Sequence, residues 1–437
     1  MSVSILSYIP SAQHAAIAAR TSTYDASADF QNAIDALAAI GGGGAHGGGT
    51  LYIPAGKYRL NSSITNKKHV SLLGDGPTAS TLEWASTHTG HGIQQLAAIN
   101  GSTQVNNRIE KIGLVSRAGE SNTGGAFYER GGTQVKFRDC QFIHFKYGVI
   151  LDQSEIVTIR DCDFAENYHS CLWIVNGYEP ALGNTNAAGG YTNIIEAMGC
   201  QFNVPVQYGI LDDGGVGHNF LNNSFNGGTT QIRAAGVQGL VIQGNYMEAA
   251  TSRVIYFTNY TLSEVGAGAC GYVLVAGNSI FPAAGQHCIQ SGSLGRLTLV
   301  ANGFGNVNNS GVASVNCHEM NRVHSLGNTT ENTGGMFQNA PYVARWSAEA
   351  LIHGSATANV GSIAAGGSAY VNVTATGAAV GDRIDFVAAS VDLGDDITLS
   401  GRVSAADTVR VKLTNTGASA VDPPSCTYSV RIEKQTI

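Results

Sequence analysis

VKFRDCQF (Val135–Phe142) and TIRDCDF (Thr158–Phe164) are two copies of one pattern, in which alternating apolar residues are followed by a Cys and, two positions later, a Phe. Corresponding positions of the two stretches lie 22 residues apart. A fixed period of this length indicates a repeat architecture. The same slot recurs along the chain, with Phe, Met or Ile two positions after it, at Cys140, Cys162, Cys200, Asn223, Asn245, Asn278 and Asn302.

The alternation within each copy has a period of two, which is typical of β-strands and not of helices. A repeat of about 22 residues is too short for two helices but accommodates three short strands. The sequence therefore predicts an all-β fold, a right-handed parallel β-helix in which each strand pairs with its counterpart one coil away. We expect the recurring Cys or Asn to point inward at a turn, where Asn amides form a hydrogen-bonded ladder.

The composition is consistent with a solenoid, and the net charge argues against one class of binding partner. A quasi-one-dimensional solenoid can reach 437 residues, whereas a single compact core rarely does. The net charge of −7 argues against nucleic acid as a partner, because nucleic acid favours a basic surface. No signal peptide follows Met1 and no apolar run is long enough to cross a membrane, so we expect synthesis in a cytoplasm and no membrane insertion.

Both ends of the chain differ from the repeat. ADFQNAIDALAAI places Phe30, Ile34 and Leu37 on one helical face, which predicts a helix that caps the open end of the solenoid, with Asp25 or Ser27 as its N-cap. After Asn328 the repeat fades, and alternating segments separated by Gly, Asp and Pro turns predict a β-sandwich. The expected organisation is an N-terminal arm (1–24), a capped β-helix (25–340) and a C-terminal β-sandwich domain (341–437).

Several stretches resemble known proteins. FQNAIDAL, GGGTLYIPAGKYRL and VSLLGDGPTASTLEW resemble the start of the pectate-lyase-like (pectin-lyase-like) β-helix family. YIPSAQHAAIAARTSTYD, just before them, resembles the corresponding segment of bacteriophage tailspike polysaccharide depolymerases, and residues 351–437 resemble β-sandwich modules of phage tail proteins. The resemblance implies a homotrimer of the virion tail or baseplate that binds and usually cuts bacterial surface polysaccharide. For the β-sandwich we expect a role in trimerisation or capping first and in carbohydrate binding second.

The chemistry is expected on the strand that begins after each Phe slot. If the apolar residues of these strands point inward, one outward row contains Asp152, Trp173, Asp213, Arg233 and Tyr256, with Glu129 one coil earlier. Aromatic rings stack on sugar faces, Arg binds carboxylates or hydroxyls, and two carboxylates can serve as acid and base. A slip of one residue exchanges the faces of a strand, so Asp212 is the alternative to Asp213, and Trp173 then belongs to the core.

Three carboxylates are the catalytic candidates. Asp152 and Asp213 lie two coils apart, about 9.5 Å, near the upper end of the spacing in inverting glycosidases. Glu248 follows Met247 directly and is expected to face outward near the edge of the row. For each of them taken singly, a solvated surface carboxylate is the alternative explanation.

Two histidines and the absence of metal-ligand spacing also bear on function. His169 lies in the turn before the Trp173 strand and is the candidate base of a lyase, whereas His218 occupies an inward slot and is expected to be buried with its hydrogen bonds satisfied. No His, Cys and Asp cluster has metal-ligand spacing, so we expect no structural zinc and no cofactor, although outward Asp residues leave calcium open. Two long insertions, 177–191 and 259–272, are expected either to wall a sugar groove or to be tolerated surface loops.

Three functions from two classes follow. The favoured one is a glycoside hydrolase that acts on capsule, exopolysaccharide or O-antigen through two of the three carboxylates. The second is a polysaccharide lyase, in which Arg233 neutralises a uronate carboxylate and a Tyr or His abstracts the α-proton. The third is a receptor-binding fibre protein that binds glycan without cutting it. An acidic outward row would repel a uronate, and this consideration favours hydrolysis.

Overall fold

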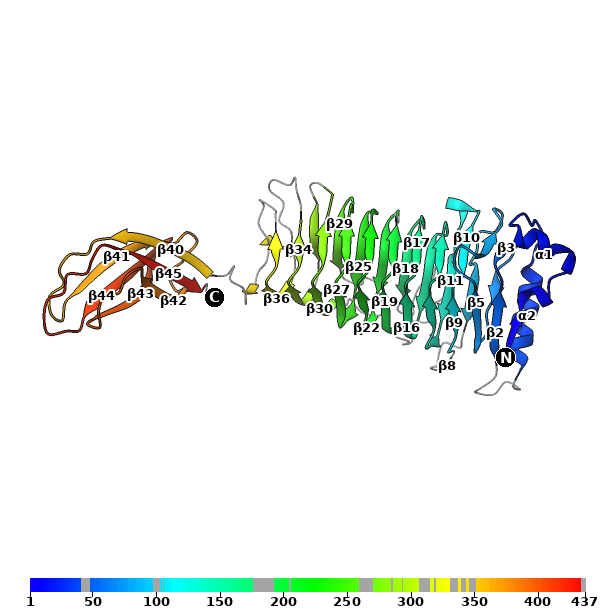
Figure 1. Cartoon of the computed structure of the whole chain (residues 1–437), viewed down its shortest axis with the longest axis horizontal. Coiled ribbons are helices and arrows are strands. Elements are labelled where there is room, and N and C mark those ends of the chain that lie inside the picture. The colour runs from blue at the N-terminus through cyan, green and yellow to red at the C-terminus, as the bar shows by residue number, and fades with distance from the viewer. Residues whose placement is uncertain are drawn as a thin grey trace. The chain divides into compact units, whose positions relative to one another are not determined.

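The structure is a computed structural model that describes residues 1–40, 48–96, 103–104, 106–175, 192–203, 206–258, 270–283, 286–292, 294–305, 315–317, 320–330, 337–338, 343–345 and 351–433. The expected insertions 177–191 and, up to residue 269, 259–272 lie outside these residues. The chain divides into two compact units, one of residues 1–323 with 328–341, the other of residues 324–327 with 342–437. The first is a parallel β-helix and the second a β-sandwich, so the predicted fold class is confirmed (Figure 1).

Three sheets of parallel strands, here called A, B and C in the order in which each coil visits them, form the β-helix. Sheet A contains β1 (Ser2–Ser4), β2 (Gly49–Ile53), β5 (Val70–Gly74), β8 (Thr103–Gln104), β9 (Arg108–Glu110), β12 (Gly132–Thr133), β13 (Lys136–Arg138), β16 (Glu155–Arg160), β19 (Asn193–Met198), β22 (Gly215–Val216), β23 (Asn219–Leu221), β26 (Val237–Gln238), β27 (Leu240–Gln243), β30 (Cys270–Ala276), β33 (Leu294–Val300) and β36 (Met320–Leu326). Sheet B contains β3 (Gly56–Leu60), β6 (Ser80–Trp84), β10 (Gly113–Ser116), β14 (Gln141–Ile143), β17 (Asp163–Ala165), β20 (Gln201–Asn203), β24 (Ser224–Asn226), β28 (Tyr246–Glu248), β31 (Ser279–Phe281), β34 (Gly303–Phe304) and β37 (Thr329–Thr330). Sheet C contains β4 (Ile64–Thr65), β7 (Ile93–Leu96), β11 (Gly125–Arg130), β15 (Tyr147–Asp152), β18 (Ser170–Val175), β21 (Tyr208–Asp213), β25 (Thr230–Ala235), β29 (Arg253–Thr258), β32 (His287–Ser291), β35 (Val315–Cys317) and β38 (Phe337–Gln338).

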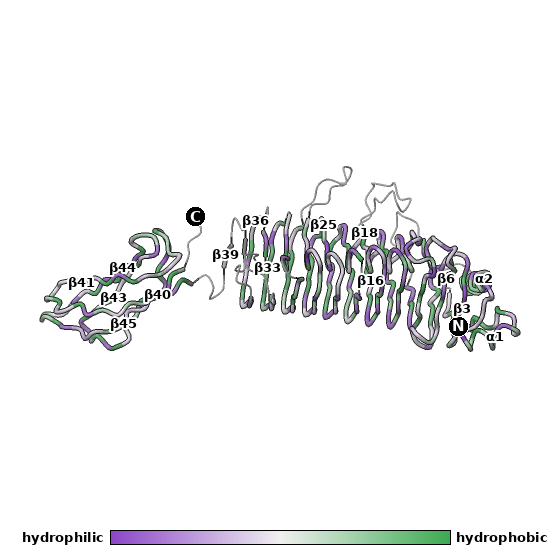
Figure 2. The backbone as a smooth tube through the Cα atoms, turned by 90° about the horizontal axis from the view of Figure 1, so that it is seen from above, coloured by the Kyte–Doolittle hydropathy of each residue, from purple (hydrophilic) through white to green (hydrophobic). Residues whose placement is uncertain are grey.

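The Phe slot of the repeat forms a column of rings inside the β-helix. Phe142, Phe164, Phe202 and Phe225 pair in register across neighbouring strands of sheet B. Their ring centroids are 4.9, 5.0 and 4.6 Å apart, close to the spacing of the strands themselves, and all four side chains are fully buried. Hydrophilic and hydrophobic residues alternate along the coils, as this arrangement requires (Figure 2).

The predicted Asn ladder is confirmed at the turn between sheets A and B. Asn223 Nδ2 donates to Asn245 Oδ1 (3.1 Å) and to the main-chain oxygen of Ala197 (3.0 Å), and the Asn223 main-chain N–H donates to the same Oδ1 (2.9 Å). The pattern repeats from Asn245 to Asn278 and continues through Asn302 and Asn328. Each buried amide is therefore satisfied by the coils on either side of it.

The residue before each slot explains how the chain turns there. Its φ is positive in coil after coil, at Asp139, Asp161, Gly199, Asn222, Gly244, Gly277, Ala301 and Gly327. Gly and, less often, Asn and Asp adopt this left-handed conformation at low cost. At Gly244 space also matters, because a Cβ would lie 2.2 Å from the side-chain oxygen of Asn222. The turn therefore needs one left-handed residue followed by one inward polar or small residue.

Two short helices cover the first coil. α1 (Ser11–Ala18) and α2 (Ser27–Ala39) follow β1 and the 3-10 helix η1 (Ile5–Ser7), and a second 3-10 helix, η2 (Gly119–Ser121), lies between β10 and β11. α2 buries Phe30, Ile34 and Leu37 as predicted, and it packs on β2, β4 and β5. Its N-cap position is Ala26, while the Asp25 carboxylate accepts hydrogen bonds from the main-chain N–H and the hydroxyl of Ser27.

The second unit is a sandwich of two antiparallel three-stranded sheets, preceded by the short strand β39 (Val343–Arg345). One sheet has the order β40 (Leu351–Ala358), β45 (Cys426–Glu433), β42 (Arg383–Ala389), and the other β41 (Ser368–Thr374), β44 (Thr408–Asn415), β43 (Ile397–Ala405). Alternate apolar residues of both sheets form one core, which includes Val373, Val411 and Tyr428. Two sheets that each have one apolar face pack face to face in this way.

The ladder predicts a specific stability defect. Asn245→Leu removes the donor to Asn278 and the acceptor for Asn223, so it should lower the free energy of unfolding by about 2–4 kcal/mol. Asn245→Cys should cost clearly less, because Cys occupies the same slot in three other coils. Chemical unfolding of both variants tests this, with the exposed Asn226→Leu on β24 as control. Equal losses for the Leu and Cys variants would contradict the ladder's role.

Candidate functional site on the outer face of sheet C

The register of sheet C separates an inner from an outer set of side chains. Val149 pairs with Leu172, and Leu172 with Ile210, so this row points into the core. The neighbouring row, one residue further along each strand, points outward and contains Ile150, Trp173, Leu211, Arg233 and Tyr256. The sheet thus brings three of the candidate residues, Trp173, Arg233 and Tyr256, into one outer row.

Aromatic rings gather at the start of β15, β18 and β21. The Tyr147 ring stacks on Trp173, with centroids 4.6 Å apart and planes 29° apart. The His169 ring lies between them and the next coil, 5.1 Å from Tyr147 and 5.5 Å from Tyr208. The Arg233 guanidinium lies over the Tyr208 ring at 6.0 Å. Tyr147 and Trp173 are buried within this aromatic platform, whereas His169 and Tyr208 are partly exposed and offer ring surface of the kind that sugar faces stack on.

Asp213 lies beside this platform and is held on both oxygens. Trp173 Nε1 donates to its Oδ2 at 2.9 Å, and Arg233 Nη1 donates to its Oδ1 at 2.9 Å. The Asp213 side chain is 16% exposed and that of Arg233 is 27% exposed. The pair is therefore open to solvent while the two donors fix the direction of the carboxylate.

Asp152 occupies the same outer row as Asp213 but is fully buried. Asp152 pairs with Val175, and Val175 with Asp213, so the two carboxylates are two strands apart, about 9.5 Å. The Tyr128 hydroxyl donates to Asp152 Oδ2 at 3.0 Å. Burial, and then the Asp152 charge, raise the pKa of Tyr128, so this hydroxyl keeps its proton for the hydrogen bond.

The prediction that Glu129 faces outward is wrong. β11 pairs with β15 so that Phe127 matches Val149 and Arg130 matches Asp152, which leaves Glu129 in the inner row with Leu151. The Glu129 side chain is fully buried, and neither carboxyl oxygen forms a well-aligned hydrogen bond within the described residues. Burial raises the pKa of Glu129 to about 8, against smaller opposing effects of the Gln95 side chain and the Gly132 backbone.

The alternative of Asp212 in place of Asp213 is also wrong. Asp212 pairs with Ile174 and is fully buried in the interior. Its Oδ2 lies 2.8 Å from His218 Nδ1, and His218 Nε2 lies 3.2 Å from the Thr192 carbonyl oxygen. Burial lowers the pKa of His218, but Asp212 and the Thr192 carbonyl outweigh it and raise that pKa. The expectation that His218 is buried and satisfied is confirmed, and its partner explains why Asp212 is inside.

Glu248 and His169 lie on different sides of the β-helix, Glu248 on sheet B and His169 beside sheet C. Glu248 lies on β28 of sheet B, where the Tyr246 hydroxyl donates to its Oε2 at 2.7 Å, so it does not share a sheet with Asp213. His169 belongs to the aromatic platform. Burial, and then the charges of Lys146 and Arg233, lower the pKa of His169 to about 4, so its imidazole is neutral at pH 7.

Several residues of this face were not among the candidates predicted from the sequence. Lys146 lies 5.2 Å from the Tyr147 ring, and Arg253 lies 4.3 Å from the Tyr256 ring. Tyr147 and Tyr208 each begin a strand with the pair Tyr-Gly, a recurrence that would have identified them. Because Glu129 and Asp212 are inside and Asp152 is buried, the expectation of an acidic row is wrong: cations outnumber exposed carboxylates on the described part of this face.

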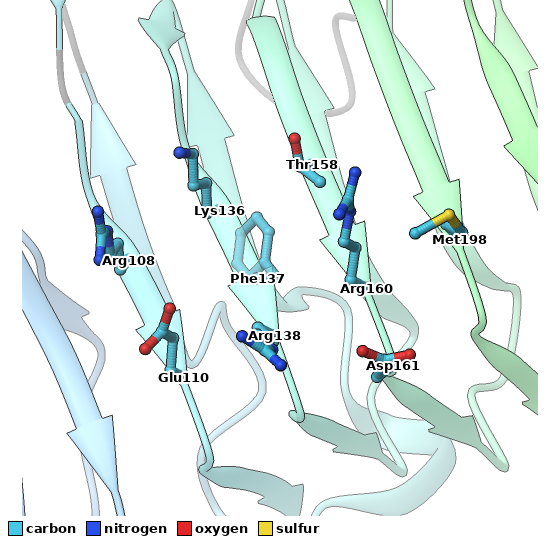
Figure 3. A pocket seen from close by; sticks show the side chains of 9 residues that line it. All are labelled: Arg108, Glu110, Lys136, Phe137, Arg138, Thr158, Arg160, Asp161 and Met198. Carbon is cyan, nitrogen blue, oxygen red and sulfur yellow. The ribbon is translucent and has the colours of Figure 1, made fainter.

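A groove lies on the outer face of sheet A, with a volume of about 470 Å³ (Figure 3). Four cations line it: Arg108, Lys136, Arg138 and Arg160. Arg160 is bound to Glu196 at 2.6 Å, Arg138 lies 3.6 Å from Asp139, and Glu110 and Asp161 also line the groove. The one aromatic residue of the lining, Phe137, is buried. This mixed charge without an exposed ring favours sheet C as the candidate site.

Neither a metal site nor a membrane-spanning helix is found in the described part of the chain. There, no cluster of three or more His, Cys, Asp or Glu side chains has an arrangement that would hold a metal ion. The same residues include no helix that is long and apolar enough to span a membrane.

The sequence was compared with protein families and with curated proteins. The model of the family described as "Rhamnogalacturonase A/epimerase, pectate lyase-like" matches residues 18–271. No curated protein matches the chain significantly.

Solved structures share the fold at low sequence identity. ORF18 of Geobacillus virus E2 is 14% identical, with a TM-score of 0.56 over 100% of this chain and 79% of that one. The Dettilon tailspike protein is 12% identical, with a TM-score of 0.51 over 99% and 94%. The Streptococcus pneumoniae surface protein and adhesin PfbA is 13% identical, with a TM-score of 0.53 over 79% and 99%. At these identities the likeness concerns the fold.

The buried Glu129 predicts a pH dependence of stability. Its pKa is raised from 4.5 to about 8, so the folded state holds a proton that the unfolded state releases. The corresponding stability is complete below about pH 4.5 and is lost as the pH rises through about 8. Unfolding followed from pH 4 to pH 9 should show a decline that Glu129→Gln lacks, with the exposed Glu120→Gln as control. A decline of equal size in the Glu129→Gln variant would refute the assignment.

Proposed function

The chain belongs to the rhamnogalacturonase A/epimerase, pectate lyase-like family, and from this premise we propose that it is a phage tailspike depolymerase that binds and cleaves a bacterial surface polysaccharide. The fold shared with a tailspike and a virus protein supports the phage origin. The proposal includes a homotrimer on the virion tail or baseplate. The glycan lies along the outer face of sheet C, across the coils that carry Trp173, Arg233 and Tyr256.

The observation that carries the proposal is the Asp213 carboxylate held by Trp173 and Arg233 beside an aromatic platform. Sugar rings stack on the aromatic side chains, which positions the chain of sugars against the carboxylate. The two donors hold Asp213 in one orientation, as a positioned general base requires. A surface carboxylate without such partners has no fixed orientation.

The favoured reaction is hydrolysis with inversion. Asp213 accepts a proton from a water molecule, whose oxygen attacks the anomeric carbon while the glycosidic bond on the opposite side breaks. In this scheme Asp152 is the general acid: it must take up a proton when the glycan displaces Tyr128, and it gives that proton to the departing oxygen. A separation of about 9.5 Å leaves room for both the water and the sugar. Because Asp152 is buried under Tyr128, the glycan must displace this hydroxyl when it binds.

Elimination is the second candidate, and a separate observation favours it. Lys146 and Arg233 lie beside the platform, and Arg253 lies two coils beyond Tyr208, so the face suits a uronate more than an acidic row would. Arg233 would neutralise the uronate carboxylate, and the neutral His169 imidazole would take the proton next to it. The double bond that forms is conjugated with the carboxylate and absorbs ultraviolet light. Binding without cleavage is the third candidate, since an adhesin shares the fold.

The test of the proposal follows product formation on a panel of capsular and lipopolysaccharide preparations. New reducing ends without ultraviolet absorbance establish hydrolysis, whereas both signals together establish elimination. Glycan binding without fragments assigns the protein to the non-catalytic class. If no preparation gave either fragments or binding, that result would refute the proposed function altogether.

Asp213→Asn is expected to reduce kcat by about 100-fold or more if hydrolysis operates, because a general base typically contributes that much. Binding of the polysaccharide should persist, since the aromatic platform is intact. Asp139→Asn, which changes a partly exposed Asp on the sheet A side, is the matched control and should leave kcat unchanged. A fully active Asp213→Asn variant would exclude the assignment.

Trp173→Phe isolates the hydrogen bond to Asp213. The ring remains available for stacking on Tyr147, but the Nε1 donor is lost. Loss of one charge-assisted hydrogen bond of about 1.5–3 kcal/mol should lower kcat/KM by about 10-fold or more. Steady-state kinetics with purified polysaccharide measures this. An unchanged kcat/KM would mean that Trp173 serves only as packing.

A further inference from the structure

We propose that the outer face of the sheet β41-β44-β43 in the β-sandwich binds a polysaccharide that carries carboxylate or phosphate groups. The outward residues of this sheet are polar throughout, as the alternation of each strand shows. They include Ser368, Tyr370, Asn372, Thr398, Ser400, Arg402, Arg410, Lys412 and Thr414. The face thus combines three cations, an amide and an aromatic ring.

The cations on this face occupy neighbouring positions, where their like charges repel one another. Arg410 pairs directly with Arg402 on the neighbouring strand, and Lys412 is two positions from Arg410 on the same face. Like charges in directly opposed cross-strand positions are destabilising. No salt bridge to any of the three is present among the described residues. A ligand with negative charges would relieve the repulsion that the protein alone leaves in place.

The carboxylates of this unit avoid the face. Asp385 and Glu433 belong to the other sheet, where Asp385 binds Arg431 at 2.6 Å. The remaining described carboxylates lie in turns and connections, at Asp382, Asp392, Asp395, Asp396, Asp407 and Asp422. In a chain with a net charge of −7, a three-cation sheet face without a described acidic side chain is a local reversal of charge. Charge complementarity therefore selects an anionic occupant.

Tyr370 argues for a sugar polymer as that occupant. Its ring is 58% exposed although it lies in the middle of a strand, and the Arg410 guanidinium lies 5.8 Å from the ring centroid. An exposed ring offers a stacking surface for a pyranose, and the adjacent guanidinium can form paired hydrogen bonds with a carboxylate or phosphate of the same sugar. Such a second contact would hold the protein on the polymer between encounters at sheet C, because linked sites raise the effective concentration.

The proposal concerns binding and does not require cleavage, so its failure and that of the depolymerase proposal are separable. The test uses the full chain and follows acylation of Lys412 by mass spectrometry, with and without polymer. Polygalacturonate supplies carboxylates, a glycerol-phosphate teichoic acid supplies phosphates, and neutral dextran supplies neither. We expect at least one charged polymer to slow acylation of Lys412 about threefold or more, and dextran to leave it unchanged.

Variants sharpen the test. Arg402→Gln with Arg410→Gln, and separately Tyr370→Ala, should abolish the protection of Lys412, whereas Arg383→Gln on the opposite sheet should retain it. The double Arg variant should unfold at the same temperature as the parent or higher, because a repulsive pair is removed. An acylation rate that no polymer changes would overturn the proposal. A Lys412 that is shielded only in concentrated protein would overturn it too, and would assign the face to contacts between copies.

Discussion

Register between successive coils is the constraint on which the rest of the β-helix depends. Parallel strands in a solenoid place each residue beside its counterpart one coil away, so an error at one turn would propagate to every side chain that follows it. The ladder from Asn223 to Asn328 and the column of Phe rings fix this register at the turn between sheets A and B. Burial makes the ladder strict, because the side-chain hydrogen bonds that hold each amide go to the neighbouring coils.

The same register determines which side chains of sheet C face inward and which face outward. Within the single strand β21, Asp212 points inward to His218 and Asp213 points outward to Trp173 and Arg233. Two adjacent carboxylates thus serve opposite purposes, one as the partner of a buried imidazole and the other as the open carboxylate of the candidate site. The same alternation explains why Glu129 is enclosed and protonated at neutral pH.

Sequence reasoning reached the fold and part of the site for an identifiable physical reason. The Cys/Asn and Phe slots recur because a stacked ladder and a stacked ring column tolerate few residue types, and this makes the period visible. The connection from the Phe slot to sheet C varies in length, from Phe142 to Val149 and from Phe164 to Leu172, so the phase of each strand must be inferred again. In GAFYER the adjacent aromatic residues Phe127 and Tyr128 allow either phase, so the alternation predicts the wrong face for Glu129. Contacts between neighbouring coils, such as that of Tyr128 with Asp152, cannot be read from the pattern of a single repeat.

A crystal structure of the Asp213→Asn chain with an oligosaccharide of the target polysaccharide would test the central claim most directly. The expected result is a chain of sugar rings along the outer face of sheet C, stacked near His169 and Tyr208, with a glycosidic oxygen between residue 213 and Asp152. An oligosaccharide bound instead in the groove of sheet A, beside Arg108 and Lys136, would contradict it.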